Sequence, residues 1–368
     1  MANLFDYLKW RGDIDLYVSP LNEIDALILS EISYLDFSGL VPEDGITLED
    51  LAKKFFSDAK RVLRPLGLII PDAIPVIFKF ASKTPRFAKM KVIAFESDTD
   101  ASIEKQFSAT AFDTCDRAIF VAYRGTDDTI VGWKENFRMS YVDIIPAQLD
   151  AKRFLEKVAI ENPSSPVRIA GHSKGGNLAT FASLTASKDI RERVTGIYCF
   201  DGPGLLGPMA DNENYKVLGD RIRTFVPENS VVGLLLSHDE RLITVRSSGK
   251  GLYQHDAFNW KVNVTRFDAL PENSMKNLKT SKIIKKWLEA NDQDTRREFC
   301  ETFFDILRST GAKTLTDLSV DSLAKAKIMF TEISKLDKEK KKKMADVMSI
   351  LIKESLRSTS RKYLDSDQ

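Results

Sequence analysis

Residues 167–179 place the strongest constraint on how this chain can fold. They read Val-Arg-Ile-Ala-Gly-His-Ser-Lys-Gly-Gly-Asn-Leu-Ala, so a short apolar segment leads through Gly-x-Ser-x-Gly into a run of helix-forming residues. A serine on a sharp turn from a strand into a helix needs small neighbours, because a Cβ on either flanking glycine would collide with the strand and the helix. The pattern therefore predicts a strand, a tight turn with Ser173 at its tip, and a helix that begins directly after it.

This strand–turn–helix setting is typical of the nucleophile elbow of an α/β-hydrolase fold. Ser173 would lie at the positive end of the helix dipole, and the backbone N–H of Lys174 would be available to a developing oxyanion. The alternative interpretation is an ordinary strand-to-helix turn that carries a serine without a catalytic role. The two interpretations differ in whether the chain supplies a base and an acid elsewhere.

Three histidines are available as a base for Ser173, namely His172, His238 and His255. The side chain of His172 is expected to point away from its neighbour Ser173. The other two follow Ser173, in the order Ser…Asp/Glu…His that α/β-hydrolases require. His255 follows a glycine-led loop after a predicted strand at residues 242–247, whereas the acids around His238 indicate a solvated turn. His255 is therefore predicted as the base.

Two acidic residues are candidates to orient the imidazole of His255. Asp201 follows a predicted buried strand at residues 195–200 and precedes Gly-Pro-Gly, a position from which a carboxylate can hold an imidazole. Glu228 follows the next predicted strand, at residues 221–226, and many hydrolases carry their acid in that later loop. Asp201 is predicted as the acid and Glu228 is the alternative. In the interpretation without catalysis, Asp201 only caps its own turn.

The loop after an earlier predicted strand, at residues 118–123, reads Arg-Gly-Thr, and Gly-Trp-Lys-Glu-Asn-Phe follows at residues 132–137. These segments resemble the Arg-Gly-Thr/Ser…Trp segment of the class 3 (fungal-type) triacylglycerol lipases. In those enzymes the threonine or serine supplies an oxyanion donor, and the resemblance implies this role for Thr126. The chain departs from these lipases at Ser230, where they carry the aspartate of the triad. The Asp-Gly-Pro-Gly turn instead resembles the Asp-Pro-x-x-Pro turn of pancreatic-type lipases, which favours Asp201.

Six short segments carry a broader resemblance. They are Asp-Tyr-Leu-Lys-Trp-Arg-Gly-Asp at 6–13, Asn-Glu-Ile-Asp at 22–25, Gln-Phe-Ser-Ala at 106–109, Tyr-Arg-Gly-Thr-Asp at 123–127, the segment 171–179, and Asp-Gly-Pro-Gly at 201–204. Together, over about residues 1–265, they resemble the Mbeg-like family. This is a bacterial group of lipase-like α/β-hydrolases long described as a domain of unknown function. The resemblance implies the fold and a serine-hydrolase site, and it leaves the substrate open.

The chemistry that these resemblances imply is acyl transfer in two steps. Ser173 would attack an ester or thioester carbonyl while His255 accepts its proton and Asp201 orients the imidazole. The N–H groups of Thr126 and Lys174 would bind the oxyanion, and water would then release the acyl group, so neither a metal nor an organic cofactor is needed. The expected substrate is a lipid or an acylated small molecule. Because the acid position of class 3 lipases is changed, a catalytically silent fold used for binding or scaffolding is the alternative.

Composition narrows the function classes. The chain has 368 residues, 43% of them hydrophobic, which suffices for a large core, and its net charge of +1 gives no electrostatic basis for nucleic-acid binding. The cysteines are widely spaced in apolar surroundings without metal-ligand spacing, which indicates reduced thiols and a cytoplasmic protein: Cys115, Cys199 and Cys300. The first residues lack the basic and apolar regions of a signal peptide. The most apolar stretch, residues 66–80, is too short and too rich in proline for a transmembrane helix.

The pattern of elements divides the chain into three parts. Residues 1–90 are predicted to be mainly helical, and residues 63–80 within them form either a packed cover or a lid over an apolar site. Residues 91–268 alternate strands with helices, which predicts a mostly parallel sheet wrapped by helices, the α/β-hydrolase core. Residues 269–368 are predicted as an appendage of three helices. One begins near residue 294, a second runs from 315 to 336, and a third begins at 337 and carries apolar residues after 344, namely Val347, Ile350, Leu351 and Leu356.

A run of lysines lies near the start of the last predicted helix. It consists of Lys338, Lys340, Lys341, Lys342 and Lys343. Such a run is either a solvated helix start or a contact with anionic lipid headgroups, so peripheral membrane binding is an open alternative. The helical appendage is expected to serve packing, oligomerisation or a partner, and the sequence leaves the oligomeric state open.

Overall fold

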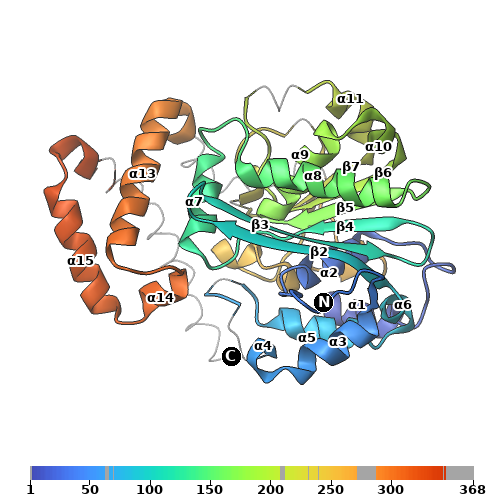
Figure 1. Cartoon of the computed structure of the whole chain (residues 1–368). Helices are drawn as coiled ribbons and strands as arrows, with labels where there is room; N and C mark the ends of the chain where they lie inside the picture. The colour runs from blue at the N-terminus through green and yellow to red at the C-terminus, as the bar shows by residue number, and fades with distance from the viewer. Residues whose placement is uncertain are drawn as a thin grey trace.

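A single sheet organises the molecule. The computed structural model describes residues 2–62, 66–68, 70–207, 212–230, 232–238, 240–271, 287–342 and 344. Within these ranges eight strands lie side by side in chain order (Figure 1). They are β1 (Ile46–Thr47), β2 (Lys91–Asp100), β3 (Lys105–Asp113), β4 (Ile119–Tyr123), β5 (Val167–His172), β6 (Val194–Phe200), β7 (Ile222–Pro227) and β8 (Leu242–Val245). A separate hairpin pairs β9 (Val262–Asn263) with β10 (Arg266–Phe267).

The half of the sheet that carries the candidate site is parallel. Strands β4 to β8 pair in parallel, whereas β1 to β4 pair antiparallel. All five residues of β4 are buried, as expected for a parallel strand covered on both faces. Its side chains alternate between two cores: Phe120 and Ala122 belong to one, and Ile119, Val121 and Tyr123 to the other. The predicted α/β-hydrolase fold with a mostly parallel sheet is confirmed.

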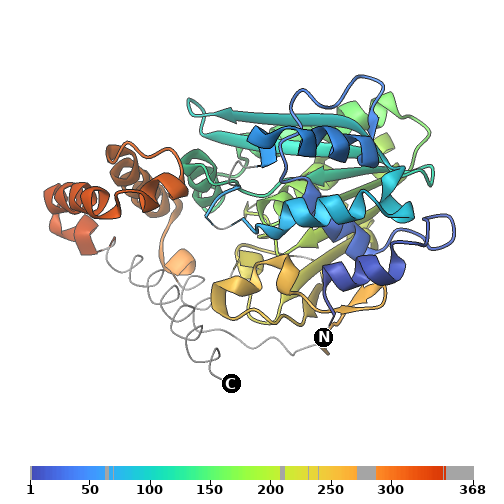
Figure 2. The ribbon, with the colours of Figure 1, turned by 90° about the horizontal axis from the view of Figure 1, so that it is seen from below.

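Helices cover both faces of the sheet (Figures 1 and 2). One face carries α8 (Pro146–Glu161), α9 (Lys174–Thr185), α10 (Lys188–Arg193) and α11 (Asn214–Leu218). The other face carries the N-terminal helices α1 (Leu4–Arg11), α2 (Glu23–Ile32), α3 (Leu48–Ser57), α4 (Ala59–Val62), α5 (Ala73–Ala81) and α6 (Pro85–Ala88). Residues 1–90 are therefore mainly helical, as predicted, and they also contribute the short edge strand β1.

Helix α2 lies against β5 and is fixed there by a buried polar cluster. Asn22 caps the helix, and its side chain accepts hydrogen bonds from the backbone of Ile24 and Asp25. The Asp25 carboxylate receives Arg86 Nε at 2.7 Å and the Tyr7 hydroxyl at 2.7 Å. Both ionic side chains are fully buried, so each charge depends on the other for compensation. The cluster joins α1, α2 and α6 and gives α2 a fixed position under the sheet.

The segment 63–80, predicted as a packed cover or a lid, is partly described. Residues 63–65 and 69 lie outside the described residues. Within the rest, α5 buries Ile74, Ile77 and Phe78 in the same core as α2. Its outer face exposes about half of Val76 and Phe80. The inner face is thus a packed cover, and motion of the segment as a lid stays a prediction.

The C-terminal helices form a separate layer beside α7 (Ile130–Arg138), at one end of the molecule (Figure 2). Helix α13 (Gln293–Ser309) agrees with the predicted helix that begins near residue 294. The single helix predicted from 315 to 336 is wrong, because the structure has α14 (Leu315–Ser319) and α15 (Ser322–Lys335). Asp321 between them has a left-handed φ of 51°, a conformation that cannot continue a helix.

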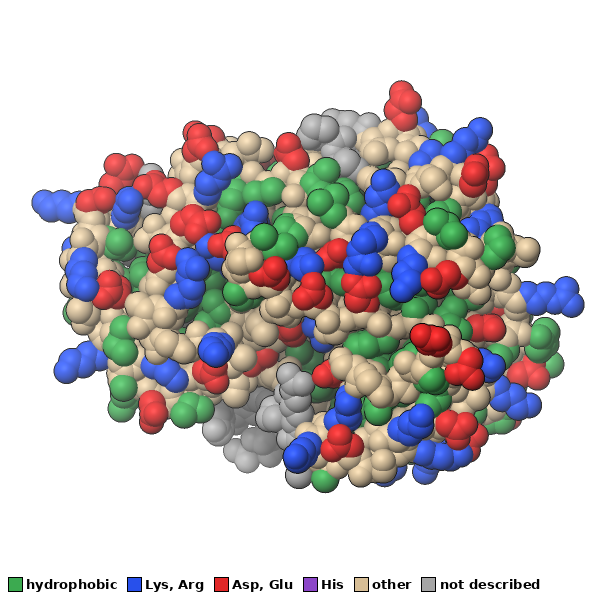
Figure 3. Space-filling view, in the orientation of Figure 1, with side chains coloured by type: hydrophobic (Ala, Val, Ile, Leu, Met, Phe, Trp, Pro, Cys, Tyr) green, Lys and Arg blue, Asp and Glu red, His purple; other side chains and the backbone are tan. Residues whose placement is uncertain are grey.

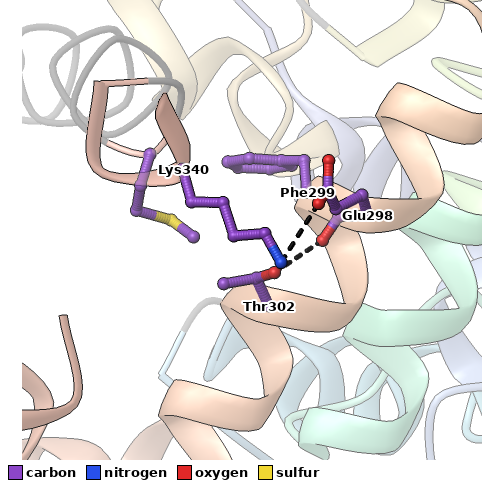
Figure 4. A pocket seen from close by; sticks show the side chains of 5 residues that line it. Glu298, Phe299, Thr302 and Lys340 are labelled. Atoms are coloured by element: carbon purple, nitrogen blue, oxygen red, sulfur yellow. Dashed lines mark hydrogen bonds and ion pairs between the residues drawn. The ribbon is translucent and has the colours of Figure 1, made fainter. Parts of the chain in front are cut away.

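The lysine run begins as predicted but ends outside the described residues. Residues 338–342 are helical, while Lys343 and the predicted apolar residues after 344 are not described. Lys340 pairs with Glu298 of α13 at 3.1 Å, beside a small open pocket lined also by Phe299, Thr302 and Met344 (Figure 4). At least one lysine of the run therefore packs on α13, and membrane contact through the others stays a prediction.

The surface and the thiols add three observations. Basic and acidic side chains are interspersed over the face shown in Figure 3, in keeping with a net charge of +1. No helix in the described part of the chain is long and apolar enough to cross a bilayer. The three cysteines carry free thiols, of which Cys199 and Cys300 are buried.

Candidate active site

The strand–turn–helix at Ser173 has the geometry that its sequence predicts. Strand β5 ends at His172, α9 begins at Lys174, and Ser173 between them has φ 58° and ψ −132°. A non-glycine residue in this region is strained, and such strain persists where the surrounding structure over-determines it. A Cβ on Gly171 would lie 2.2 Å from the backbone of Gly175, and one on Gly175 would lie 2.1 Å from Tyr123 O. The two glycines let β4, β5 and α9 converge at the serine.

Ser173, His255 and Asp201 form one line of hydrogen bonds. His255 Nε2 lies 2.9 Å from Ser173 Oγ, and His255 Nδ1 lies 2.6 Å from Asp201 Oδ2. The three residues come from the ends of β5 and β6 and from the loop after β8. The Asp201 side chain is fully buried, whereas the His255 side chain is 26% exposed. The structure thus brings together the predicted nucleophile, base and preferred acid, and the predicted base is partly exposed to solvent.

The carboxylate of Asp201 is held by further donors. Gly233 N–H donates to Asp201 Oδ1 at 3.1 Å, and the Ser230 hydroxyl donates to the same oxygen. Ser230 occupies the sequence position that raised the question about the acid, and here it supports the acid of the neighbouring loop. Glu228, the alternative acid, lies half-buried at the end of β7, where its N–H donates to Val245 O.

His238 lies apart from this line, in a pair of its own. Its Nδ1 is 2.9 Å from Glu240 Oε1, and the Thr224 hydroxyl donates to that oxygen at 2.6 Å. The solvated turn predicted here is wrong, because the His238 side chain is 8% exposed and that of Glu240 is 2% exposed. Burial works to raise the pKa of Glu240, but the hydrogen bonds from His238 and Thr224 outweigh it and lower that pKa below its ordinary value.

The loop that carries Thr126 adjoins the elbow. Strand β4 pairs with β5 in parallel with Tyr123 opposite Gly171, so the loop after β4 and the turn after β5 leave the sheet at the same edge. Thr126 is buried, and its Oγ1 accepts a hydrogen bond from Asn136 Nδ2 of α7. The sequence interpretation did not single out Asn136, although it lies in the segment 132–137 that carries the lipase resemblance.

The side chain of Lys174 supports the site from behind. The sequence predicted a role for its backbone N–H, but the Nζ atom is fully buried and lies 2.9 Å from Glu135 Oε2. It also donates to the backbone and side-chain oxygens of Gln106, each at 2.6 Å. Glu135 in turn accepts the N–H groups of Gln106 and Ala147. These contacts connect α9 to β3, α7 and α8 next to Ser173.

Replacement of Lys174 by methionine is expected to lower the free energy of unfolding by about 3–5 kcal/mol, because it leaves the Glu135 carboxylate buried without its partner. Urea titration followed by circular dichroism measures this loss. Lys188→Met is the matched control, since its pair with Glu192 is 3.8 Å long and both side chains are more than half exposed. An equal stability for the two variants would show that the buried pair contributes nothing.

The described residues contain no group of three or more His, Cys, Asp or Glu side chains that could hold a metal ion. What the site offers is a buried carboxylate, an imidazole, a hydroxyl at the end of a helix, and backbone N–H groups of two adjoining turns. This set can transfer a proton from the hydroxyl and stabilise a developing oxyanion, which are the two requirements of acyl transfer.

Several solved structures resemble this chain at low identity. The match to a fungal lipase structure covers 70% of this chain and 90% of the lipase chain, with a TM-score of 0.41 and 14% sequence identity. The mono- and diacylglycerol lipase from Aspergillus oryzae covers 73% and 86%, with a TM-score of 0.39 and 13% identity. The M37 lipase covers 59% and 70%, with a TM-score of 0.38 and 17% identity. Among curated proteins, none matches this sequence.

One family model matches the sequence directly. The model described as Mbeg1-like matches residues 81–305, which is more than half of the chain. The matched range contains the elbow at Ser173, the Thr126 loop and both Asp201 and His255. The family resemblance is thereby confirmed over residues 81–305, which do not include the motifs at 6–13 and 22–25, and this chain belongs to the Mbeg1-like family.

Proposed function

We propose that this chain is a serine acyl hydrolase that cleaves a carboxylic ester of a lipid or an acylated small molecule. The observation that carries the proposal is the continuous line from Ser173 Oγ through His255 to Asp201, with separations of 2.9 and 2.6 Å. An ionised carboxylate only accepts hydrogen bonds, so Asp201 keeps the proton on Nδ1 of the imidazole. Nε2 is then left with a lone pair directed at the serine hydroxyl.

The reaction follows from this arrangement. His255 Nε2 takes the hydroxyl proton as Ser173 Oγ bonds to the ester carbonyl carbon, and the carbonyl π pair moves onto oxygen. The carbonyl re-forms as the ester C–O bond breaks, and the leaving alkoxide receives the proton from Nε2. Water then gives a proton to Nε2 and attacks the acyl group, and Ser173 departs with that proton. Each proton and electron pair is accounted for by these groups and water.

The N–H groups of Thr126 and Lys174 are the proposed donors to the oxyanion, each worth about 3–4 kcal/mol in the transition state. Because Asn136 Nδ2 donates to Thr126 Oγ1, the hydroxyl hydrogen of Thr126 remains available for a third hydrogen bond to the oxyanion. This arrangement supports an oxyanion hole shared between the β4 loop and the elbow.

The proposed substrate carries an apolar acyl chain. The Leu68 side chain is 63% exposed, and its backbone N–H donates to Asp128 Oδ1 at 3.0 Å, two residues after Thr126. The exposed side chains of Val76 and Phe80 on α5 belong to the same N-terminal segment. These apolar groups support an acyl-chain wall in the described part of residues 63–80, with a lid motion as the means of access.

The cytoplasm is the proposed location. Burial raises the pKa of the Cys199 thiol to about 12 and that of Cys300 to about 11, so both remain protonated and unreactive. Buried free thiols of this kind favour a reducing compartment.

Labelling with a fluorophosphonate probe tests the proposed function. The native protein should be labelled on one residue, and mass spectrometry of the digested adduct should place the phosphonyl group on Ser173. A series of p-nitrophenyl esters of increasing acyl length should then give turnover that rises with chain length up to the limit of the pocket. Heat-denatured protein is the control, because labelling that survives unfolding does not need the triad.

Absence of labelling, both in buffer and with detergent micelles, would contradict the proposal. The micelle arm separates a closed lid from an inactive site, since an apolar surface favours the open state of a lid. If the protein is labelled neither in buffer nor with micelles, the result would favour a hydrolase fold used for binding or scaffolding.

A further inference from the structure

The histidine that precedes Ser173 touches the candidate base rather than the nucleophile. The rings of His172 and His255 lie 4.6 Å apart between centroids, with 30° between their planes. His172 Nε2 lies 2.9 Å from the backbone carbonyl oxygen of His255. A carbonyl oxygen only accepts, so Nε2 carries the proton of the neutral ring and Nδ1 is left as an acceptor.

Two side chains of the N-terminal region meet that acceptor. The Tyr34 hydroxyl and Glu31 Oε1 each lie 3.3 Å from His172 Nδ1. Glu31 is the last-turn residue of α2 and its side chain is 1% exposed, while Tyr34 follows two residues after the end of that helix. The sequence separation of 138 residues between Tyr34 and His172 explains why no local pattern pointed to this contact.

The cluster contains three ionisable groups, and burial favours the uncharged form of each. Burial, together with the charge of Asp256, raises the pKa of Glu31 well above its ordinary value, and Glu31 Oε1 makes no hydrogen bond within the described residues. Burial, and then the proximity of His255, hold the pKa of His172 well below that of a free imidazole. An uncharged ring therefore lies against His255, and no positive charge opposes the imidazolium that forms during acyl transfer.

The Tyr34 hydroxyl also reaches the loop that carries Thr126. A Cβ on Gly125 would lie 2.0 Å from the Tyr34 hydroxyl and 2.8 Å from His172 O, so only glycine fits there. Burial raises the pKa of Tyr34 well above its ordinary value, and a hydrogen bond with the Gly125 backbone opposes that rise. One hydroxyl thus touches both the loop of the proposed oxyanion donor and the histidine that holds the backbone of the base.

We propose that Tyr34 and Glu31 are positioning residues, which act through His172 to fix His255 relative to the loop of Thr126. The inference rests on the proposed hydrolase function and deepens it, because it assigns part of the N-terminal helical region to the active site. A base displaced by about 1 Å loses on the order of a hundredfold in rate, so loss of the shared hydroxyl contact falls on turnover rather than on substrate binding.

Tyr34→Phe tests this assignment, since it removes the hydroxyl and keeps the ring. We expect kcat for a p-nitrophenyl ester to fall by about 10- to 100-fold with KM unchanged, and the rate of fluorophosphonate labelling to fall in parallel. Tyr123→Phe is the matched control. It also removes a buried hydroxyl, which donates to Ala151 O at 2.6 Å on the opposite face of the sheet. The control should lose comparable stability and keep its kcat.

Glu31 supplies a second, independent arm. Glu31 Oε1 packs 3.3 Å from His172 Nδ1, so Glu31→Gln keeps the shape of the side chain and should hold kcat within about threefold. Glu31→Ala leaves a void beside the His172 ring and should lower kcat as Tyr34→Phe does. Equal turnover in native protein, Tyr34→Phe and Glu31→Ala would overturn the inference while leaving the proposed function standing.

A spectroscopic measurement tests the inference even in a protein without turnover. The chain has three histidines, so a ¹⁵N-histidine sample gives few and assignable ring signals. We expect His172 to remain the neutral Nε2–H tautomer across about pH 5–8, and the His255 signals to shift in Tyr34→Phe but not in Tyr123→Phe. Titration of His172 within that range, or unchanged His255 signals in Tyr34→Phe, would contradict the positioning role.

Discussion

Replacement of His255 by alanine is expected to lower kcat for ester hydrolysis by about 10⁵- to 10⁶-fold, because the nucleophile loses its base. In the proposed mechanism the hydroxyl proton leaves through the 2.9 Å contact between His255 Nε2 and Ser173 Oγ, and no other histidine of the described residues contacts Ser173. Steady-state hydrolysis of a p-nitrophenyl ester measures the loss, and the rate of fluorophosphonate labelling should fall with it.

His238→Ala is the matched control for this variant. It also removes a histidine that contacts a buried carboxylate, Glu240, so it should destabilise the fold. Its turnover should nevertheless stay within about threefold of the native value, since His238 lies outside the line of Ser173, His255 and Asp201. A loss of activity in His238→Ala with full activity in His255→Ala would show that His238, and not His255, is the base.

The elbow was predictable because its constraints are local. The two glycines, the apolar strand before them and the helix after them all lie within residues 167–179, and a Cβ on Gly171 or Gly175 would lie only 2.2 or 2.1 Å from neighbouring backbone atoms. The order of Ser173, Asp201 and His255 along the chain followed from the fold class. The choice between Asp201 and Glu228 rested on a resemblance to other lipases. No local pattern could decide it, because it depends on which of the two loops, after β6 or after β7, brings its carboxylate to His255.

Contacts between distant segments were not predictable from the sequence. Tyr34 and His172, or Lys174 and Gln106, meet only once the sheet has formed, and neither pair belongs to a common periodic pattern. The break between α14 and α15 was missed for another reason. The apolar positions continue through it, while the left-handed backbone at Asp321 interrupts the helix without a glycine or proline to mark it.

Hydrogen bonds connect the start of the C-terminal helix α14 to the loop that follows β4. Asp128 O accepts the N–H of Leu315, and Asp128 Oδ2 accepts the N–H of Thr316. The N–H of Ile130 donates in turn to Lys313 O. The start of α14 is therefore hydrogen-bonded to the segment that directly follows Thr126, and the other carboxylate oxygen of Asp128 holds Leu68. The loop that carries Thr126 is therefore hydrogen-bonded to both the N-terminal and the C-terminal regions.

The second large effect on kcat is expected from a change of the proposed acid, Asp201. Asp201→Asn is expected to lower kcat by about 10⁴-fold while leaving the hydrogen bond from Gly233 in place. An asparagine amide at this position donates to His255 Nδ1, which moves the ring proton to Nε2. That tautomer presents an N–H to Ser173 and cannot accept the hydroxyl proton. Stopped-flow measurement of acyl-enzyme formation separates this effect from slower deacylation.

Glu228→Gln distinguishes the two candidate acids under the same assay. Its carboxylate belongs to the loop after β7, where Ser230 and Gly233 already direct their donors at Asp201, so its turnover should stay within about threefold of the native value. Loss of activity in Glu228→Gln with an active Asp201→Asn would move the acid to the later loop. If Glu228→Gln is active as expected, Ser230 and Asp201 act together. Ser230 stands where class 3 lipases carry their aspartate, and its hydroxyl donates to the carboxylate of Asp201, which follows the preceding strand β6. That carboxylate then keeps the proton on Nδ1 of His255.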